Sequence, residues 1–166
     1  MFYSYIIYII ILLVVTVIES TWLSSLNIYR PDISLLVLTY LSFKSTSAQG
    51  IVSGFVSGLI IDGTSLAPWG YSALLRTAIA WIYSIFSGKL ILDRLFIPML
   101  MGFTASLIKY IIMLLLFLIF KIPSTITSII SLNTLIEIGL NTAAAPLVFL
   151  LLSLIVNFRK RDKDIV

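Results

Sequence analysis

The stretch GIVSGFVSGLIIDGTSLAPWG, Gly50 to Gly70, places small residues and a carboxylate inside a hydrophobic chain. Gly50, Gly54 and Gly58 recur every four residues, so on a helix they form one stripe that drifts by only about 40° per step. Small residues in this arrangement let a second helix approach closely, which favours packing between membrane helices. Asp62 continues the same spacing. The stretch therefore predicts a helix-packing surface with a carboxylate at its end.

The end of the same stretch predicts a turn. Asp62-Gly63 is a typical helix stop, and Pro68-Trp69-Gly70 contains residues that favour a change of chain direction. Trp69 is expected at the depth of the membrane interface, where tryptophan is enriched. A further helix is expected to begin directly after this turn.

The composition predicts an integral membrane protein. Hydrophobic residues make up 60% of the 166 residues and charged residues 11%, which leaves too little polar surface to cover a soluble globule. The sequence contains neither cysteine nor histidine, which excludes disulfides, thiolate or imidazole metal ligands and a histidine general base. We expect no enzyme activity, no cofactor and no metal. The net charge of +4 comes without the basic and aromatic groove that nucleic-acid binding needs.

Six apolar segments are separated by charges, prolines and glycines. All are expected to be helical, because a lipid-facing backbone must satisfy its own hydrogen bonds. We predict an all-α, polytopic membrane protein with about six transmembrane helices and short loops, comprising one transmembrane domain (1–158) and a basic cytoplasmic tail (159–166). The segments are Phe2 to Leu23, Asp32 to Phe43, Ser47 to Ile61, Tyr71 to Ser87, Leu95 to Phe120 and Leu132 to Phe158.

The second and third segments are short for membrane spans. Asp32 to Phe43 would reach only about 18 Å as a helix, against a hydrocarbon core of roughly 30 Å. These segments are either short spans in locally thinned lipid or a hairpin buried among the other helices. A five-span alternative joins Asp32 through Ile61 into one helix, but it would bury Lys44 near the middle of the membrane. We favour six spans.

The basic residues predict the orientation. With six spans, both termini lie in the cytoplasm, in agreement with the positive-inside rule. The first segment is expected to be a retained span rather than a removable signal peptide. The tail is expected to stop transfer and to bind lipid headgroups, and contact with a cytoplasmic partner is the alternative. The inner side then holds Lys44, Lys89, Arg94, Arg159, Lys160, Arg161 and Lys163, and the outer side holds Arg30 and Lys121.

Five ionisable residues fall in the outer half of this arrangement. An ionisable residue within a span is expensive and usually faces the bundle interior, so we predict a polar cluster organised around Arg76. For Glu19 and Asp32 we favour an interfacial position that reaches headgroups and water, since Pro31 at the first helical position followed by Asp32 is also an ordinary helix start. For Arg76 and Glu137 we favour pairing or a partner contact. The five residues are Glu19, Asp32, Asp62, Arg76 and Glu137.

Two further features mark the last two segments. Lys109 lies near the middle of its segment and is expected to face protein, with Asn141 as a possible hydrogen-bonding neighbour; a transport path is the alternative use of such a lysine. Pro146 removes one backbone donor and should kink its helix beside small residues. A broken transporter helix is the alternative interpretation of that kink.

Three motifs in order resemble the bacterial rod-shape-determining MreD family. The first is Arg30-Pro31-Asp32 opening a leucine-rich segment. The second is Gly50-x3-Gly54-Phe55-x2-Gly58-Leu59-x2-Asp62, and the third is Ser65-x2-Pro68-x-Gly70-Tyr71-x-Ala73-Leu74. The specific part of the resemblance runs from Arg30 to Leu75, while the second half agrees in hydropathy and size.

The resemblance implies a non-enzymatic subunit of the cell-elongation machinery in the bacterial cytoplasmic membrane. The implied partners are a bitopic MreC-like protein and, indirectly, MreB-like filaments, a RodA-like synthase and a class B penicillin-binding protein. It also implies a fold similar to the six-helix substrate-binding subunits of energy-coupling-factor transporters. Those subunits often carry an Ala-x3-Ala docking motif for their transmembrane partner. The segment Phe2 to Leu23 contains no alanine, which weakens the interpretation as a transporter subunit.

On this interpretation intramembrane grooves bind the transmembrane helix of the MreC-like partner. The alternative for the glycines is packing against the protein's own helices. The alternative function is a small-molecule-binding subunit of a transporter, and a third is an assembly factor unrelated to cell shape. The residues expected to make or support the partner contact are Arg30, Asp32, Gly54, Gly58, Asp62, Pro68, Gly70 and Arg76.

Overall fold

The computed structural model describes residues 2–21, 30–65, 68–87, 95–120 and 131–161, and within these ranges it contains six helices and no strand. Each predicted segment corresponds to one helix, with ends that differ by a few residues, so the all-α prediction is confirmed. Leu23, Lys89, Arg94, Lys121 and Lys163 lie outside the described residues. The helices are α1 (Phe2–Thr21), α2 (Ile33–Lys44), α3 (Ser47–Thr64), α4 (Tyr71–Ile85), α5 (Phe96–Phe120) and α7 (Leu132–Arg161).

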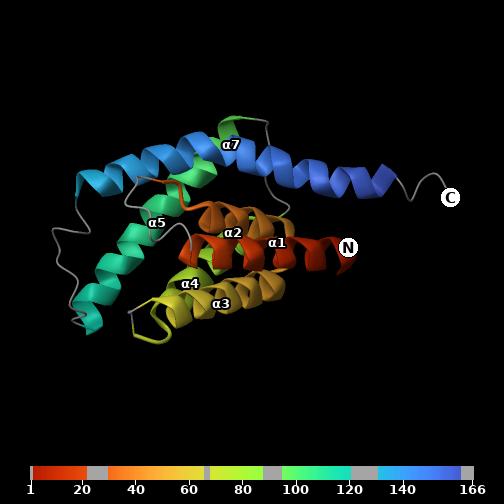
Figure 1. The fold of residues 1–166 in the computed structure, drawn as a ribbon. Coiled ribbons are helices and arrows are strands. Elements are labelled where there is room, and N and C mark those ends of the chain that lie inside the picture. Colours follow the sequence, from red (N-terminus) through yellow and green to blue (C-terminus); the bar gives the residue numbers. More distant parts are fainter. Residues whose placement is uncertain (1, 22–29, 66–67, 88–94, 121–130, 162–166) are drawn as a thin grey trace.

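The first four helices pack together, and α7 lies along them (Figure 1). α5 crosses α7 obliquely and slants away from it toward its own carboxyl end. The amino end of α1 and the carboxyl end of α7 lie at the same end of the molecule.

Two helices are long and apolar enough to cross a membrane by length and composition: Phe96–Ile119 and Leu132–Ile155, each of 24 residues. Tyr5–Thr21 and Ile33–Lys44 are shorter apolar helices. The helical, apolar character is therefore consistent with a membrane protein. The number of spans stays a prediction.

α2 is the centre of the bundle. All residues from Ser34 to Phe43 are buried, and α1, α3, α4, α5 and α7 all contact α2. A helix that is hydrophobic all round requires such burial. Of the two predicted alternatives for this short segment, the arrangement agrees with a helix buried among the other helices.

A break separates α2 from α3, as the six-segment prediction requires. α2 ends at Lys44 and α3 begins at Ser47. The backbone N–H of Thr46 donates to Oε1 of Gln49 at 3.2 Å, as in one half of a capping box. The five-span alternative needs one continuous helix through these residues, and it is wrong.

Aromatic contacts join three helices in the core. The Tyr40 ring of α2 meets Tyr8 of α1 at a centroid distance of 5.5 Å and Phe149 of α7 at 5.0 Å, both edge-on. This geometry is favourable because the positive edge of one ring meets the negative face of the other. These contacts fix α1 and α7 on two sides of α2.

α7 runs continuously through Pro146 to Arg161, and Figure 1 shows its axis bending about halfway along. The predicted kink agrees with this bend. Close packing occurs beside it, because a Cβ at Gly102 of α5 would lie 2.7 Å from both Ala145 Cβ and Asn141 O. Residues 159–161, assigned to the tail, continue the helix.

Candidate functional site

The glycine stripe lies in a contact between helices of this chain. A Cβ at Gly54 would lie 2.7 Å from the carbonyl oxygen of Arg76 and 2.9 Å from Ala80 Cβ. A Cβ at Gly58 would overlap the backbone of Ala73. Gly54 and Gly58 therefore pack α3 against α4, whereas a Cβ at Gly50 would lie 3.4 Å from Ser42 of α2. The predicted packing surface is confirmed. α4 occupies the space that a partner helix would need to reach Gly54 and Gly58.

Asp62 holds the first turn of α4. It is 2% exposed, and its Oδ2 accepts hydrogen bonds from the backbone N–H groups of Gly70 (2.9 Å) and Ala73 (3.2 Å). Its Oδ1 accepts from Ser72 N–H at 2.8 Å. A carboxylate is favourable at a helix start because the first N–H groups have no partner within the helix and carry partial positive charge. Asp62 thus caps α4 from the end of α3.

The predicted turn precedes α4. The N–H of Tyr71 donates to the carbonyl oxygen of Pro68 at 3.1 Å. Gly70 has φ 93° and ψ −9°, the left-handed conformation that the third position of a type II turn requires and that glycine adopts without a Cβ clash. Pro68 and Gly70 thus turn the chain and present its N–H groups to Asp62.

The amino terminus of α2 begins inside the bundle, and side chains satisfy its donors. Glu19 of α1 accepts from the N–H groups of Ile33 (3.1 Å) and Ser34 (2.8 Å). Asp32 accepts from Leu35 N–H at 2.9 Å. Asp32 is therefore the N-cap of α2, and Pro31 lies before the cap. The predicted position of Pro31, at the first residue of the helix, is wrong. Water, the usual alternative partner of these donors, is replaced by protein.

Two cations balance these carboxylates. Arg76 is 4% exposed, and its Nη2 lies 3.4 Å from Asp32 Oδ1 and 2.5 Å from Ser34 Oγ. Lys109 Nζ donates to Asp32 Oδ2 at 2.8 Å and to Glu137 Oε1 at 2.7 Å. Buried charges need such pairing to offset the cost of desolvation.

Asn141 of α7 completes this arrangement. Its Oδ1 accepts from Asp32 N–H at 2.7 Å, and its Nδ2 donates to Ser106 Oγ of α5 at 2.8 Å. We call the joined set the polar cluster. Its members are Glu19, Asp32, Ser34, Arg76, Lys109, Glu137 and Asn141, contributed by α1, α2 with its N-cap, α4, α5 and α7.

The ionisable residues of the polar cluster differ from the predicted set in two members. Asp62 lies outside the cluster, since the start of α4 engages both of its oxygens. Lys109 lies inside it, bonded to Asp32 and Glu137 rather than to the expected Asn141. The physical reason is that α5 and α7 cross obliquely (Figure 1). Residues at equal depth along two crossing helices need not face each other, so the depth of Lys109 in α5 does not identify its neighbour in α7. The interfacial position favoured for Glu19 and Asp32 is wrong, because both carboxylates bond N–H groups at the buried start of α2.

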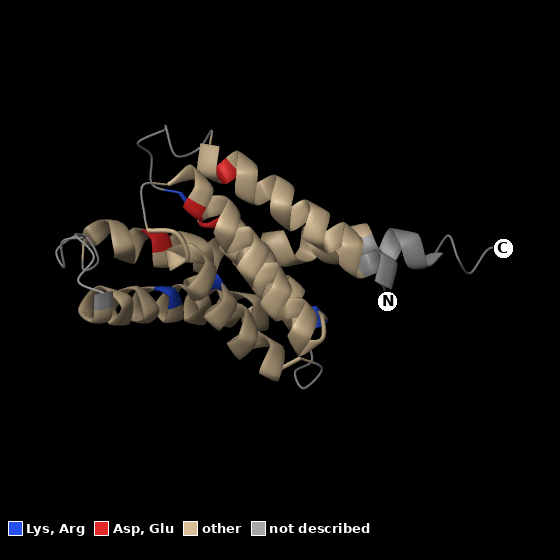
Figure 2. Ribbon diagram, turned by 90° about the horizontal axis from the view of Figure 1, so that it is seen from below, with Lys and Arg blue, Asp and Glu red and all other residues tan. Residues whose placement is uncertain are grey.

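A cavity of about 360 Å³ adjoins the polar cluster. Figure 2 shows the acidic residues of the described ranges gathered in the half of the molecule away from the two chain ends, and this cavity lies among them. Arg30, directly before Pro31 and two residues before the N-cap Asp32, lines this cavity. Its lining residues include Thr16, Glu19, Arg30, Asp32, Arg76, Lys109 and Glu137.

An apolar groove of about 490 Å³ lies between α5 and α7. Tyr110 connects it to the polar cluster, because this tyrosine lines the groove and donates through its hydroxyl to Glu137 Oε2 at 2.7 Å. Its lining residues are Leu107, Tyr110, Ile111, Leu114, Ser131, Leu132, Thr134, Leu135 and Ile138.

Comparison with known proteins identifies a family. The model of the family described as rod shape-determining protein MreD matches residues 1–155. No curated protein and no solved structure matches the chain. The match includes the motifs from Arg30 to Leu75, so the resemblance seen in them is confirmed and extends over most of the chain.

Proposed function

We propose a scaffolding role in the membrane for this chain, which belongs to the MreD family of rod shape-determining proteins because the family match covers residues 1–155. Membership places the chain in rod-shape determination, in a family of membrane proteins that act as structural components. The proposal adds the mechanism. A six-span subunit binds the transmembrane helix of a bitopic MreC-like protein and thereby links MreB-like filaments to a RodA-like synthase and a class B penicillin-binding protein.

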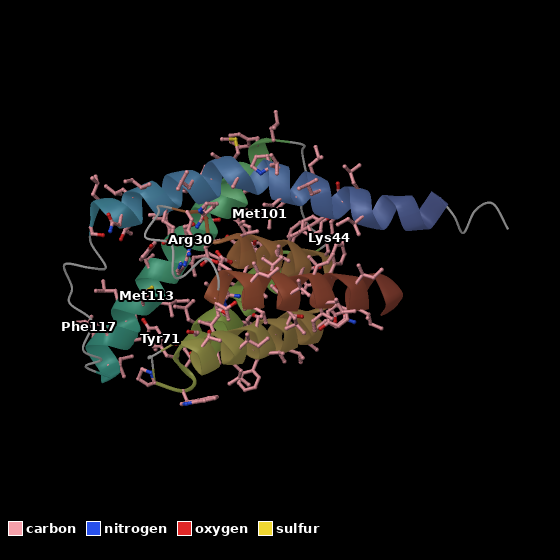
Figure 3. The ribbon with its side chains drawn as sticks, in the orientation of Figure 1. Arg30, Lys44, Tyr71, Met101, Met113 and Phe117 are labelled. Carbon is pink, nitrogen blue, oxygen red and sulfur yellow. The ribbon has the colours of Figure 1, made fainter. Side chains whose placement is uncertain are left out.

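The charge distribution supports the proposed topology. Both chain ends lie at one end of the molecule (Figure 1), and Lys44 lies at the opposite end of α2 from Arg30 (Figure 3). Basic residues favour the cytoplasmic side, so the chain ends and Lys44 face the cytoplasm and the polar cluster lies in the outer half. Residues 1–158 form the transmembrane domain, and 159–166 form the basic tail.

The observation that carries the partner contact is the groove between α5 and α7. Its walls belong to the two helices long enough to span a membrane. Ile111 and Leu135 in these walls are 56% and 67% exposed, and an apolar helix can fill such a concave, lipid-facing surface by dispersion contacts. The groove is therefore the proposed docking surface for the partner's helix.

The residues expected from the sequence then act as supports of this surface. Gly54, Gly58 and Asp62 hold α3 against α4. Arg76 of α4 reaches Asp32, which Lys109 of α5 also binds. Pro68 and Gly70 shape the turn before α4, and Arg30 precedes α2. Through these contacts the α3–α4 pair sets the position of α5 beside the groove.

Substitution within the groove tests the docking surface. Ile111→Trp fills the groove, while Ile10→Trp adds the same bulk to α1 at a position that is 53% exposed and outside the groove. Each tagged variant is expressed in the native cell at equal abundance and purified in detergent. We expect Ile111→Trp to lose the bitopic partner and Ile10→Trp to retain it. Equal retention by both variants contradicts the groove, and failure of the unsubstituted chain to retain any bitopic protein contradicts the scaffold.

A second candidate function is a small-molecule-binding subunit of a transporter, favoured by the charged cavity of about 360 Å³. Depletion in the native cell separates the two. Loss of rod shape with normal nutrient uptake supports the scaffold, whereas unchanged shape with lost uptake of one solute supports the transporter. The assembly role unrelated to cell shape is set aside by the family match. The fold similarity to energy-coupling-factor subunits stays a prediction.

A further inference from the structure

Two buried guanidinium nitrogens lack a partner within the described part of the chain: Nη1 of Arg30 and Nη1 of Arg76. Arg76 is 96% buried, since only 4% of it is exposed, and its Nη2 is already engaged by Asp32 and Ser34. A guanidinium carries only donors and stays charged. Buried polar atoms are nearly always hydrogen-bonded, so these two atoms point to an acceptor outside the described residues.

Both arginines line the same cavity of about 360 Å³. That volume exceeds the roughly 30 Å³ occupied by one water molecule in the liquid and admits a group of several heavy atoms. Polar residues of two other helices complete the wall, Thr16 and Ser20 from α1 and Thr64 from α3. The cavity therefore combines two cationic donors without a described partner, a polar wall, and enough volume for a small anionic group.

The acidic residues of this cavity are already bonded, so they do not supply the missing acceptor. Glu19 accepts from two backbone N–H groups at the start of α2. Asp32 accepts from Lys109 and from Leu35 N–H. Glu137 accepts from Lys109 and Tyr110. The charged groups of the cavity that remain without a partner among the described residues are the two guanidinium nitrogens, which select an anionic oxygen group.

We propose that this cavity binds a phosphate or carboxylate group, held by Nη1 of Arg30 and Nη1 of Arg76. Arginine suits this task, because its planar fork matches the spacing of oxygens in both groups. The bound group would supply the acceptors that both nitrogens lack. Such a group is present both in soluble anions and in lipid headgroups, and the two sources are distinguished below. The proposal does not depend on the partner helix in the α5–α7 groove.

The test measures the melting temperature of the full-length protein in an uncharged detergent, followed by tryptophan fluorescence. Sodium phosphate is titrated against sodium chloride at equal ionic strength, which reports on a soluble anion. Dioleoyl phosphatidic acid is titrated against dioleoylglycerol, which has the same chains without the phosphate and therefore reports on a lipid headgroup. Native mass spectrometry of the same sample detects a phospholipid that has remained bound through purification.

Arg30→Gln removes one of the two donors, and Lys44→Gln is the matched control, because it removes the same charge at the opposite end of α2 (Figure 3). We expect a saturable rise in melting temperature, or one retained phospholipid, in the unsubstituted protein and in Lys44→Gln. Arg30→Gln should weaken the apparent affinity at least tenfold or lose the lipid. Arg30→Lys keeps the charge without the fork and should fall between them, which separates anion binding from a folding defect.

The outcomes assign the source. Stabilisation by phosphate and phosphatidic acid indicates a site for soluble oxyanions, and stabilisation or retention of the phospholipid alone indicates a headgroup site. The proposal is overturned if neither probe exceeds its control and no phospholipid is retained, which would mean that the cavity holds water only. It is also overturned if Arg30→Gln behaves as Lys44→Gln does. Retention of the bitopic partner is a separate measurement, so failure here leaves the scaffold untouched.

Discussion

Gly58→Ala adds one methyl group where α3 touches the backbone of α4. The new Cβ would overlap Cα and N of Ala73 and the carbonyl oxygen of Ser72. These are backbone atoms, so rotation of a side chain cannot relieve the overlap, and the two helices have to move apart. Asp62 lies one turn further along α3 and holds the same end of α4, so the movement also strains its three hydrogen bonds.

The magnitude follows from two opposing effects. Overpacking a close contact costs about 1–3 kcal/mol, and the backbone overlap at Gly58 favours the upper end of that range. Replacing a helical glycine by alanine returns about 1 kcal/mol. We expect a net loss of about 2 kcal/mol in the free energy of unfolding, which is a change of roughly 30-fold in the folding equilibrium constant.

Gly63→Ala is the matched control, because it makes the same exchange in the same helix. A Cβ at Gly63 would meet only Trp69 Cη2, at the ordinary contact distance of 3.7 Å. This variant should match the unsubstituted protein or exceed its stability by up to about 1 kcal/mol. Unfolding of both purified variants in detergent is followed by tryptophan fluorescence. If Gly58→Ala is as stable as Gly63→Ala, the close approach of α3 and α4 is not what requires glycine.

Three further substitutions probe the polar contacts, each measured by the free energy of unfolding in the same detergent. Lys109→Met removes the cation shared by Asp32 and Glu137 and should lower the free energy of unfolding by about 2–3 kcal/mol. This is less than for a fully buried pair, because the three side chains keep 16–24% exposure. Adding Glu137→Gln should recover part of the loss, and strict additivity of the two substitutions would contradict the pairing. Asp62→Asn leaves one acceptor oxygen for three N–H groups and should cost about 1–2 kcal/mol; an unchanged value would show that the cap is dispensable. Asn141→Leu should cost a similar amount and accelerate hydrogen exchange at Asp32 N–H, and unchanged exchange there would contradict the bond to Asn141.

Local features of the sequence predicted the helices well. Charges, prolines and glycines mark where each apolar run stops, and these signals act within a few residues, so they require no knowledge of distant neighbours. The break after Lys44 and the turn at Pro68 and Gly70 were predicted for this reason. The contact of Gly54 and Gly58 with another helix also follows from spacing alone, although spacing does not identify which helix makes it.

The partners of the ionisable residues could not be predicted in the same way. Depth along each helix suggested that Asp62 joins Arg76 and that Lys109 meets Asn141. Asp62 instead caps α4, because the turn brings three N–H groups back to it. Lys109 instead bridges Asp32 and Glu137. A lysine in the middle of an apolar segment did signal a buried partner, and the acids at the start of α2 and in α7 were the available candidates.

The sequence by itself determined the helical membrane character of this chain, its division into six segments, its small-residue packing surface and its family. Only the tertiary structure decided that α4 packs against Gly54 and Gly58, that α2 begins within the bundle, and that two arginine nitrogens beside a cavity have no partner among the described residues. The physical reason is the range of the interactions. Helix formation and chain reversal depend on neighbouring residues, whereas the pairing of buried charges depends on how helices cross, and that is set by the packing of the whole bundle.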